Sequence, residues 1–366
     1  MKTLNLYIGR GLLVTTGIAI GVLTFVMLSA NLMKVFELLA RGVEARVLVQ
    51  FLGYLAPEML KFTIPMAVLC SSVLVFSRLA ADNEVNAMRA SGVSLWQIIS
   101  PGLVLSILLS GVCLWLQTSV SPHCLYQVEL LKRTEAVRNP LVLIEPGRFV
   151  ELPGYVIRVG GREGHELYDI HVYALDEDGR VAQDITARKG RIVLDEGTRV
   201  LQLLLEDTTI AAVDPAKDET GTRFWRSASR GISFPLNYGE EMDKRPLTRK
   251  LKHMDFPMIF AWIYIEGSEG RDTTAHYVEL NKRVSLALSP FAFLLIGIPF
   301  GIRTRRAETS VGLLVCVFLA MGFYTFILLA EGLESRPALH PEVLVWLPNI
   351  LYQGGGLWAL AVIARR

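Results

Sequence analysis

The sequence is poor in charge for its length, and it lacks the common catalytic signatures. Only 20% of its 366 residues are charged, while 52% are apolar. Soluble domains carry about 25% charged residues. There is no GxxxxGK[ST] phosphate-binding loop, no HExxH metal-binding helix and no GxSxG nucleophile elbow. We therefore predict that the chain is not an enzyme and carries no cofactor of its own.

The sequence also has only four cysteines and no large excess of positive or negative charge. Cys70, Cys113 and Cys316 lie in apolar runs and Cys124 lies just beyond one, with no CxxC pair or zinc-ligand spacing. This pattern implies neither a disulfide framework nor a zinc site. The net charge is only +2 and the charged centre is slightly acidic, which disfavours a nucleic-acid partner.

The charges that are present gather in the middle of the chain. Of its 72 charged residues, 49 lie between Glu129 and Arg283. A run of about 20 apolar residues is long enough to cross a bilayer as a helix. Six long apolar runs flank the charged centre, at residues 11–33, 47–77, 93–120, 284–302, 309–330 and 343–364. The sequence therefore predicts a membrane α-helical protein with six transmembrane helices, three on each side of an inserted domain.

Basic residues in the short loops predict the orientation, because cytoplasmic loops are enriched in lysine and arginine. With a cytoplasmic N-terminus, nine basic residues lie inside: Lys2, Arg10, Arg78, Arg89, Arg303, Arg305, Arg306, Arg365 and Arg366. Four lie outside: Lys34, Arg41, Arg46 and Arg336. We therefore expect both termini in the cytoplasm and the charged centre on the far side of the membrane.

The charged centre is predicted to be an all-β, jelly-roll-like domain. Turn formers separate short runs rich in β-branched residues, which is typical of antiparallel strands. These runs are residues 154–159, 168–174, 190–194, 199–205 and 208–213. The predicted domains are residues 1–125 with the first three spans, 126–270 with the β-domain, and 271–366 with the last three spans.

The loop RLAADNEVNAMRASG, residues 78–92, joins the second and third runs on the predicted cytoplasmic side. Val85 and Met88 recur at helical spacing, while Glu84 and Arg89 carry charge beside them. The pattern indicates a short amphipathic helix over about residues 79–91 that docks on a cytoplasmic partner. A solvated connector is the alternative interpretation of the same residues.

Several motifs resemble the permease family of the lipopolysaccharide export system, its F and G subunits. The resemblance extends over nearly the whole chain and does not separate an F-like from a G-like subunit. Its most specific part is the stretch from Glu84 to Gly92. The matching residues are Pro57-Glu58, Ile64-Pro65, Arg78-Leu79, Asn83 to Ser94, Asn281-Lys282-Arg283, Pro290, Gly297 to Gly301 and Arg303 to Arg306.

The resemblance implies a transporter subunit of the bacterial inner membrane that moves lipopolysaccharide to a periplasmic bridge protein. It also implies a paralogous permease subunit, a single-span partner with a periplasmic β-domain, and a cytoplasmic ATPase dimer that binds ATP and Mg. In this family the helix between spans two and three couples to the ATPase. Glu84 would then meet a basic residue of the ATPase, and the other coupling residues would be Val85, Met88, Arg89, Ser91 and Gly92.

Basic side chains near the outer end of the first two runs are candidate ligands for lipopolysaccharide phosphates. Lys34 and Arg41 follow the first run, and Lys61 lies within the second. At headgroup level they could hold phosphates by charge-assisted hydrogen bonds. The alternative is that each aliphatic stem lies in the interface while the ammonium or guanidinium group reaches water.

Two other classes of function compete with a lipopolysaccharide permease. A membrane-anchored sensor or scaffold with a periplasmic β-domain needs only one or two spans, so six runs disfavour it. An ion-coupled lipid carrier predicts inverted repeats and acids at mid-membrane, and the sequence displays neither.

Overall fold

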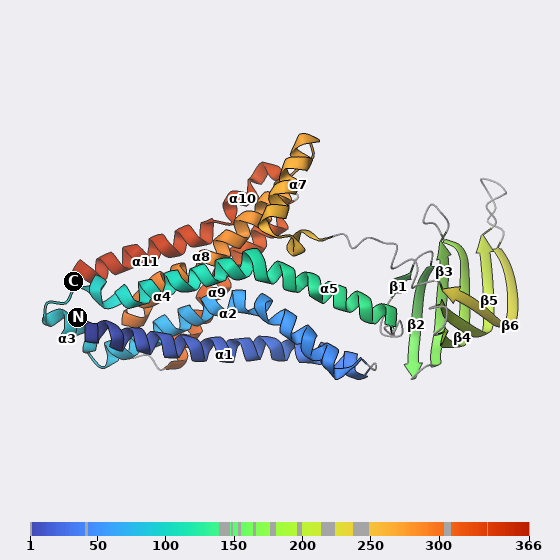
Figure 1. Ribbon diagram of the computed structural model, residues 1–366, viewed down its shortest axis with the longest axis horizontal. Coiled ribbons are helices and arrows are strands. Elements are labelled where there is room, and N and C mark those ends of the chain that lie inside the picture. The colour runs from blue at the N-terminus through green and yellow to red at the C-terminus, as the bar shows by residue number, and fades with distance from the viewer. Residues whose placement is uncertain are drawn as a thin grey trace. The chain divides into compact units, whose positions relative to one another are not determined.

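The computed structural model describes residues 2–40, 43–138, 147, 149–152, 155–163, 166–175, 181–195, 200–213, 224–236, 249–303, 309–334 and 336–365. The chain forms two compact units (Figure 1). The helical unit comprises Met1–Lys34, Val49–Val128 and Arg249–Arg366. The β-rich unit comprises Val35–Leu48 and Glu129–Thr248.

Helices carry all six apolar runs, as predicted. In the described part of the chain, six helical segments are long and apolar enough to cross a membrane. The helices are α1 (Lys2–Ala40), α2 (Ala45–Ala81), α3 (Glu84–Ala90), α4 (Leu95–Trp115), α5 (Ser121–Arg138), α7 (Phe256–Ser268), α8 (Thr274–Arg303), α9 (Thr309–Gly332), α10 (Pro341–Leu344) and α11 (Leu347–Arg365). A single π-helical turn, η1 (Leu116–Val120), joins α4 to α5, and 3-10 turns η3 (Leu251–His253) and η4 (Pro337–Leu339) precede α7 and α10.

Helix α8 lies at the centre of the helical unit and packs against α4, α7, α9, α10 and α11. Glycine allows two of its neighbours to approach its backbone. A Cβ on Gly301 would lie 2.8 Å from the carbonyl oxygen of Val73 in α2, and one on Gly356 of α11 would lie 2.6 Å from that of Leu295. Small residues at such crossings let membrane helices pack closely. The contact explains why the motif from Gly297 to Gly301 contains glycine.

The β-rich unit contains one antiparallel sheet among its described residues. Each strand pairs with the next along the chain, so the order is sequential, β1 to β6 (Figure 1). The strands are β1 (Phe149–Leu152), β2 (Tyr155–Glu163), β3 (Glu166–Leu175), β4 (Val181–Asp195), β5 (Val200–Val213) and β6 (Phe224–Leu236). An inserted β-domain is thereby confirmed, and its described strands form a meander, which refines the jelly-roll-like prediction.

The two predicted strands at 199–205 and 208–213 are in fact one strand, β5. Asp207 adopts a left-handed conformation with φ 52°, and pairing with β4 skips it, from Glu206 to Thr208. Asp169 does the same in β3, with the same φ. The residue that faces each aspartate across β3, β4 and β5, Arg188, is skipped as well, so the register is the same on both sides. The alternation is interrupted without ending the strand, which is why the sequence pattern suggested a turn.

The buried apolar face continues on both sides of these aspartates among the described side chains. In β5 the buried positions are Leu203, Leu205 and then Thr208, so the interval changes from two residues to three across Asp207. The same shift occurs in the neighbouring strands. The buried apolar cluster comprises Ile157, Val159, Leu167, Ile170, Val172, Ile185, Ala187, Leu203 and Leu205.

The helical unit resumes earlier in the chain than the predicted boundary at residue 271. Residues from Arg249 onward belong to it, so η3 and α7 are part of the helical unit. Arg283 of α8 holds this returning segment, because its guanidinium donates hydrogen bonds to the carbonyls of Leu251 and Met254.

Candidate functional site

A cavity of about 540 Å³ lies within the helical unit, next to the first turns of α8 and the last turns of α9. Apolar side chains from α1, α2 and α9, such as Met27, Phe62 and Ile327, form part of its wall. The cavity also gathers an unusual number of charged side chains for a membrane protein. They are Glu58, Lys61, Lys252, Glu279, Lys282, Arg283 and Glu331, and we call this site the polar cavity.

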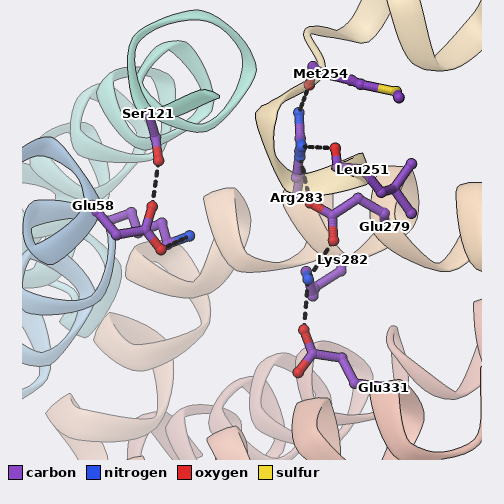
Figure 2. Close-up of polar contacts among 9 residues, drawn as sticks. Glu58, Ser121, Leu251, Met254, Glu279, Lys282, Arg283 and Glu331 are labelled. Carbon is purple, nitrogen blue, oxygen red and sulfur yellow. Dashed lines mark hydrogen bonds and ion pairs between the residues drawn. The ribbon is translucent and has the colours of Figure 1, made fainter. Parts of the chain in front are cut away.

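On one side of the polar cavity, α2 presents a lysine and a glutamate one helical turn apart. Lys61 Nζ lies 2.6 Å from Glu58 Oε1, and the Ser121 hydroxyl of α5 donates a hydrogen bond to the other oxygen of Glu58 (Figure 2). Both charged side chains are mostly buried. The pair therefore links α2 to α5 at the wall of the cavity.

Gln117 of the π-helical turn η1 also lines the cavity. Gln117 is only 3% exposed, yet its side-chain nitrogen has no hydrogen-bond partner among the described residues. A buried amide without a partner is costly, and π-turns frequently occur at functional sites. This amide can therefore donate a hydrogen bond to a ligand in the cavity.

The opposite side of the cavity contains a four-residue network on α8 and α9. Glu279 accepts from Arg283 Nε at 2.8 Å and also pairs with Lys282. Lys282 Nζ reaches across to Glu331 of α9 at 2.5 Å (Figure 2). Arg283 is 4% exposed and donates further bonds to Met254 and Leu251. This network ties α8, α9 and the segment before α7 together.

The polar cavity has a surplus of positive charge. It holds four cations and three carboxylates, and three of the cations pair with those carboxylates. Lys252 is the fourth, and no described residue contacts it as an ion pair. An anion can therefore bind at Lys252 directly, and it can compete with Glu58 and Glu331 for the other two lysines. Apolar walls beside these cations suit an anion attached to a hydrocarbon.

Only one of the three predicted substrate-binding residues can be located in this cavity. Lys61 lies in its wall. Lys34 belongs to α1, and its side chain is not among the described features. Arg41 lies outside the described residues. No cluster of three or more His, Cys, Asp or Glu placed to bind a metal occurs in the described part of the chain.

Sequence reasoning missed most of the polar cavity. Glu58 stands out only as part of the Pro57-Glu58 motif, and nothing in the sequence singles out Lys252, Glu279 and Glu331. The only available signal was the motif Asn281-Lys282-Arg283, charged residues that lead directly into an apolar span. The other members come from four separate segments, which only the packing of the helices brings together.

The predicted coupling residues lie at the other end of the helical unit, where Figure 1 places α3 beside both chain termini. Val85 is 3% exposed, and Met88 packs against the same apolar cluster. The apolar stripe of α3 therefore packs into the bundle's own core. The solvent-exposed positions between residues 81 and 92 are Ala81, Asp82, Asn83, Asn86, Ala87, Ala90, Ser91 and Gly92.

Charged residues of α3 are only loosely held. Glu84 accepts one hydrogen bond, from the Tyr7 hydroxyl at 3.3 Å. Arg89 Nη2 donates to the carbonyl of Ala364 at 3.3 Å. Ser91 and Gly92 end the helix, the first by donating to the Met88 carbonyl and the second with φ 88°. All six predicted coupling residues thus lie in α3 and the turn that follows it, where Glu84 is half-buried.

Known proteins resemble the chain over nearly its full length. The family model described as "Lipopolysaccharide export system permease LptF/LptG" matches residues 6–362. The lipopolysaccharide export system permease protein LptF of Escherichia coli strain K12 is 20% identical over 330 residues, which cover 85% of this chain and 81% of that protein. LptF of Shigella flexneri has the same identity and coverage.

Proposed function

This chain belongs to the LptF/LptG family of lipopolysaccharide export permeases, and on that premise we propose that its polar cavity holds the phosphorylated headgroup of lipopolysaccharide during ATP-driven extraction from the membrane. Family membership makes it a multi-pass inner-membrane transporter subunit. Beyond family membership, we propose the binding site for the headgroup, ATP as the energy source and the orientation of the chain in the membrane. The termini of the chain would be cytoplasmic and its β-rich unit periplasmic, as the distribution of basic residues favours.

The charge surplus of the polar cavity is the observation that carries the proposal. Lipid A bears phosphates joined to acyl chains, so a binding site needs cations beside apolar walls. Lys252 can bind a phosphate without losing a partner. Lys61 and Lys282 can exchange a carboxylate for a phosphate oxygen, which keeps each ammonium paired throughout. The buried amide of Gln117 would gain a partner at the same time.

The substrate would leave toward the β-rich unit and a periplasmic bridge protein. A paralogous permease subunit would complete the lipid cavity, and a single-span partner with a β-domain would join the assembly. Lys34 and Arg41 are proposed to contact the same headgroup. These roles come from the family resemblance and from the positions of basic residues at the outer end of the first two spans.

Energy would enter at α3. A cytoplasmic ATPase dimer with bound ATP and Mg would contact Glu84 through a basic residue, while Arg89, Ser91 and Gly92 shape the turn. Val85 and Met88 would fix α3 to the bundle, because both pack into its core. A movement of α3 would therefore move the spans directly.

Reconstitution tests the proposed function. The chain is co-purified with the subunits that accompany it, placed in proteoliposomes with lipopolysaccharide, and supplied with a soluble bridge protein. We expect lipopolysaccharide transfer to the bridge only with ATP and Mg. Transfer driven by a proton gradient without ATP would instead establish an ion-coupled carrier. Normal transfer by the double variant Lys61→Ala/Lys252→Ala would remove the polar cavity from the mechanism.

A further inference from the structure

Helix α7 exposes apolar side chains to an unusual degree. Its first ten residues, 256–265, contain no charge, and Ile259 is its only buried residue. Tyr264 is 80% exposed and Phe260 is 55% exposed, and they lie one helical turn apart on the same face. Ile265 and Trp262 are also exposed. A patch of this kind marks a surface that something apolar covers.

The length and position of α7 favour a membrane surface over a membrane span. Thirteen residues are too few to cross a bilayer. The span of α8 begins at Thr274, six residues after α7 ends. Helix α7 does not continue α8, because its Glu266 contacts His276 on the first turn of α8 and the residues just before α7 contact Arg283. The helix therefore packs beside the first turns of a membrane span.

Neighbouring elements at this end of the helical unit show the same exposure. Tyr277 on the first turn of α8 is exposed, as are Leu339 and Val343 on η4 and α10. Both α7 and α10 pack against α8. Exposed tyrosine, tryptophan and aliphatic side chains at the end of a span are typical of the membrane–water interface.

We propose that α7 lies in the headgroup region of the bilayer, with Phe260, Tyr264 and Ile265 facing phospholipid. The first charge that follows is kept off this face, because Glu266 is mostly buried and contacts His276 at 3.3 Å. An interfacial helix with aromatic and aliphatic residues on one face inserts its apolar side to a shallow depth. The occupant of the exposed face is therefore phospholipid.

Two arginines hold α7 at a fixed position on the helical unit. Arg283 binds the carbonyls of Leu251 and Met254 just before α7. Arg249 lies 4.4 Å from the centre of the Tyr126 ring on α5 and donates to the sulfur of Met258 in α7 at 3.0 Å. The chain returning from the β-rich unit is thereby anchored at the membrane surface before it enters α8.

Depth-dependent quenching tests the placement in the full chain. A fluorescent amino acid is introduced by amber suppression at Tyr264, and the protein is placed in nanodiscs whose phospholipids carry bromine near the headgroup or near the acyl-chain end. Leu108, exposed midway along α4, and Arg188, exposed on β4, are the matched control positions.

We expect headgroup-proximal bromine to quench position 264 at least about twofold more than deep bromine. Position 108 should show the reverse preference, and position 188 should not respond. A label at 264 that behaves like the one at 188 would overturn the proposal. A photocrosslinker at 264 separates the occupants further: lipid adducts support the proposal, and a cross-linked partner protein overturns it. Neither measurement uses lipopolysaccharide or ATP, so the outcome is independent of the proposed function.

Discussion

The two ends of the helical unit hold their charges in different ways. In the polar cavity, Lys61, Lys282 and Arg283 are mostly buried and contact carboxylates at 2.5–2.8 Å. At α3, Glu84 and Arg89 are half-buried, and each makes one hydrogen bond of 3.3 Å, to a neutral partner. The same residue types therefore serve as internal ties at one end and as available contacts at the other.

The difference lies in ion pairing, because the cavity cations face carboxylates whereas Glu84 and Arg89 have neutral partners. Removing one partner of a buried ion pair leaves an uncompensated charge, which costs far more than the loss of an exposed pair. Charges in the polar cavity can be given up only when another anion replaces the carboxylate. Charges at α3 can be given to a partner protein at little cost. We therefore expect stability to depend on the cavity and assembly to depend on α3.

The largest expected effect comes from Arg283→Met. This change removes the contact of Arg283 Nε with Glu279 and the donor to the buried carbonyl of Met254, so we expect a loss of about 3–5 kcal/mol in the free energy of unfolding. Denaturant titration of the full chain in detergent micelles measures it. Arg283→Lys keeps the positive charge but loses the planar guanidinium group with its several donors. Its free energy of unfolding should lie between those of the native protein and Arg283→Met. A loss below about 1 kcal/mol would mean that the network does not stabilise the fold.

Charge reversal at α3 should have little effect on the free energy of unfolding and a large effect on binding of the proposed ATPase. Glu84→Arg should leave the free energy of unfolding within about 0.5 kcal/mol of the native value, since it removes one long hydrogen bond. Binding of the proposed ATPase should fall roughly tenfold, or about 1.4 kcal/mol. Asp82→Arg makes the same charge change on the same exposed turn and serves as the control. Equal losses of ATPase affinity in both variants would mean that only the net charge of this turn matters and that Glu84 makes no specific contact.

Within the polar cavity, Lys252 should matter for ligand affinity and not for stability. Lys252→Glu removes a cation that has no described ion-pair partner, so unfolding should be unaffected. Binding of fluorescent lipopolysaccharide should weaken about threefold to tenfold, the scale of a charge-assisted hydrogen bond that is partly exposed. Lys250→Glu changes a neighbouring exposed lysine outside the cavity wall. Equal weakening by both variants would argue against a specific phosphate contact at Lys252.

Much of the fold was predictable because it depends on local composition. Six runs of about 20 apolar residues specify six membrane helices in any tertiary context. Short β-branched runs between turn formers likewise specify strands. The error at β5 shows the limit, because an aspartate with a left-handed backbone inside a strand, such as Asp207, and a turn aspartate look the same in sequence.

The candidate sites were less predictable because they depend on packing. The polar cavity joins residues from α2, α5, α8, α9 and η3, and nothing in the sequence pairs Lys282 with Glu331 or predicts the π-turn that presents Gln117. At α3, periodicity correctly identified Val85 and Met88 as an apolar stripe. It could not indicate whether a partner or the chain's own core covers that stripe, and the core covers it.

A pair of single-hydroxyl deletions compares the polar cavity with α3 most directly. Ser121→Ala takes a buried donor from Glu58 in the polar cavity, and it should cost about 1–2 kcal/mol of unfolding free energy because the carboxylate loses a partner it cannot replace from water.

Tyr7→Phe removes the hydroxyl that donates to Glu84, where solvent can take its place. We expect a change below about 0.5 kcal/mol in unfolding and less than about twofold in ATPase binding. Both variants are measured by the same denaturant titration, with ATPase binding followed in parallel. If Tyr7→Phe weakened ATPase binding as much as Glu84→Arg does, the Tyr7 hydroxyl would be required to orient the carboxylate. The charges of α3 would then be preorganised by α1, and the contrast between the two ends would hold for stability but not for assembly.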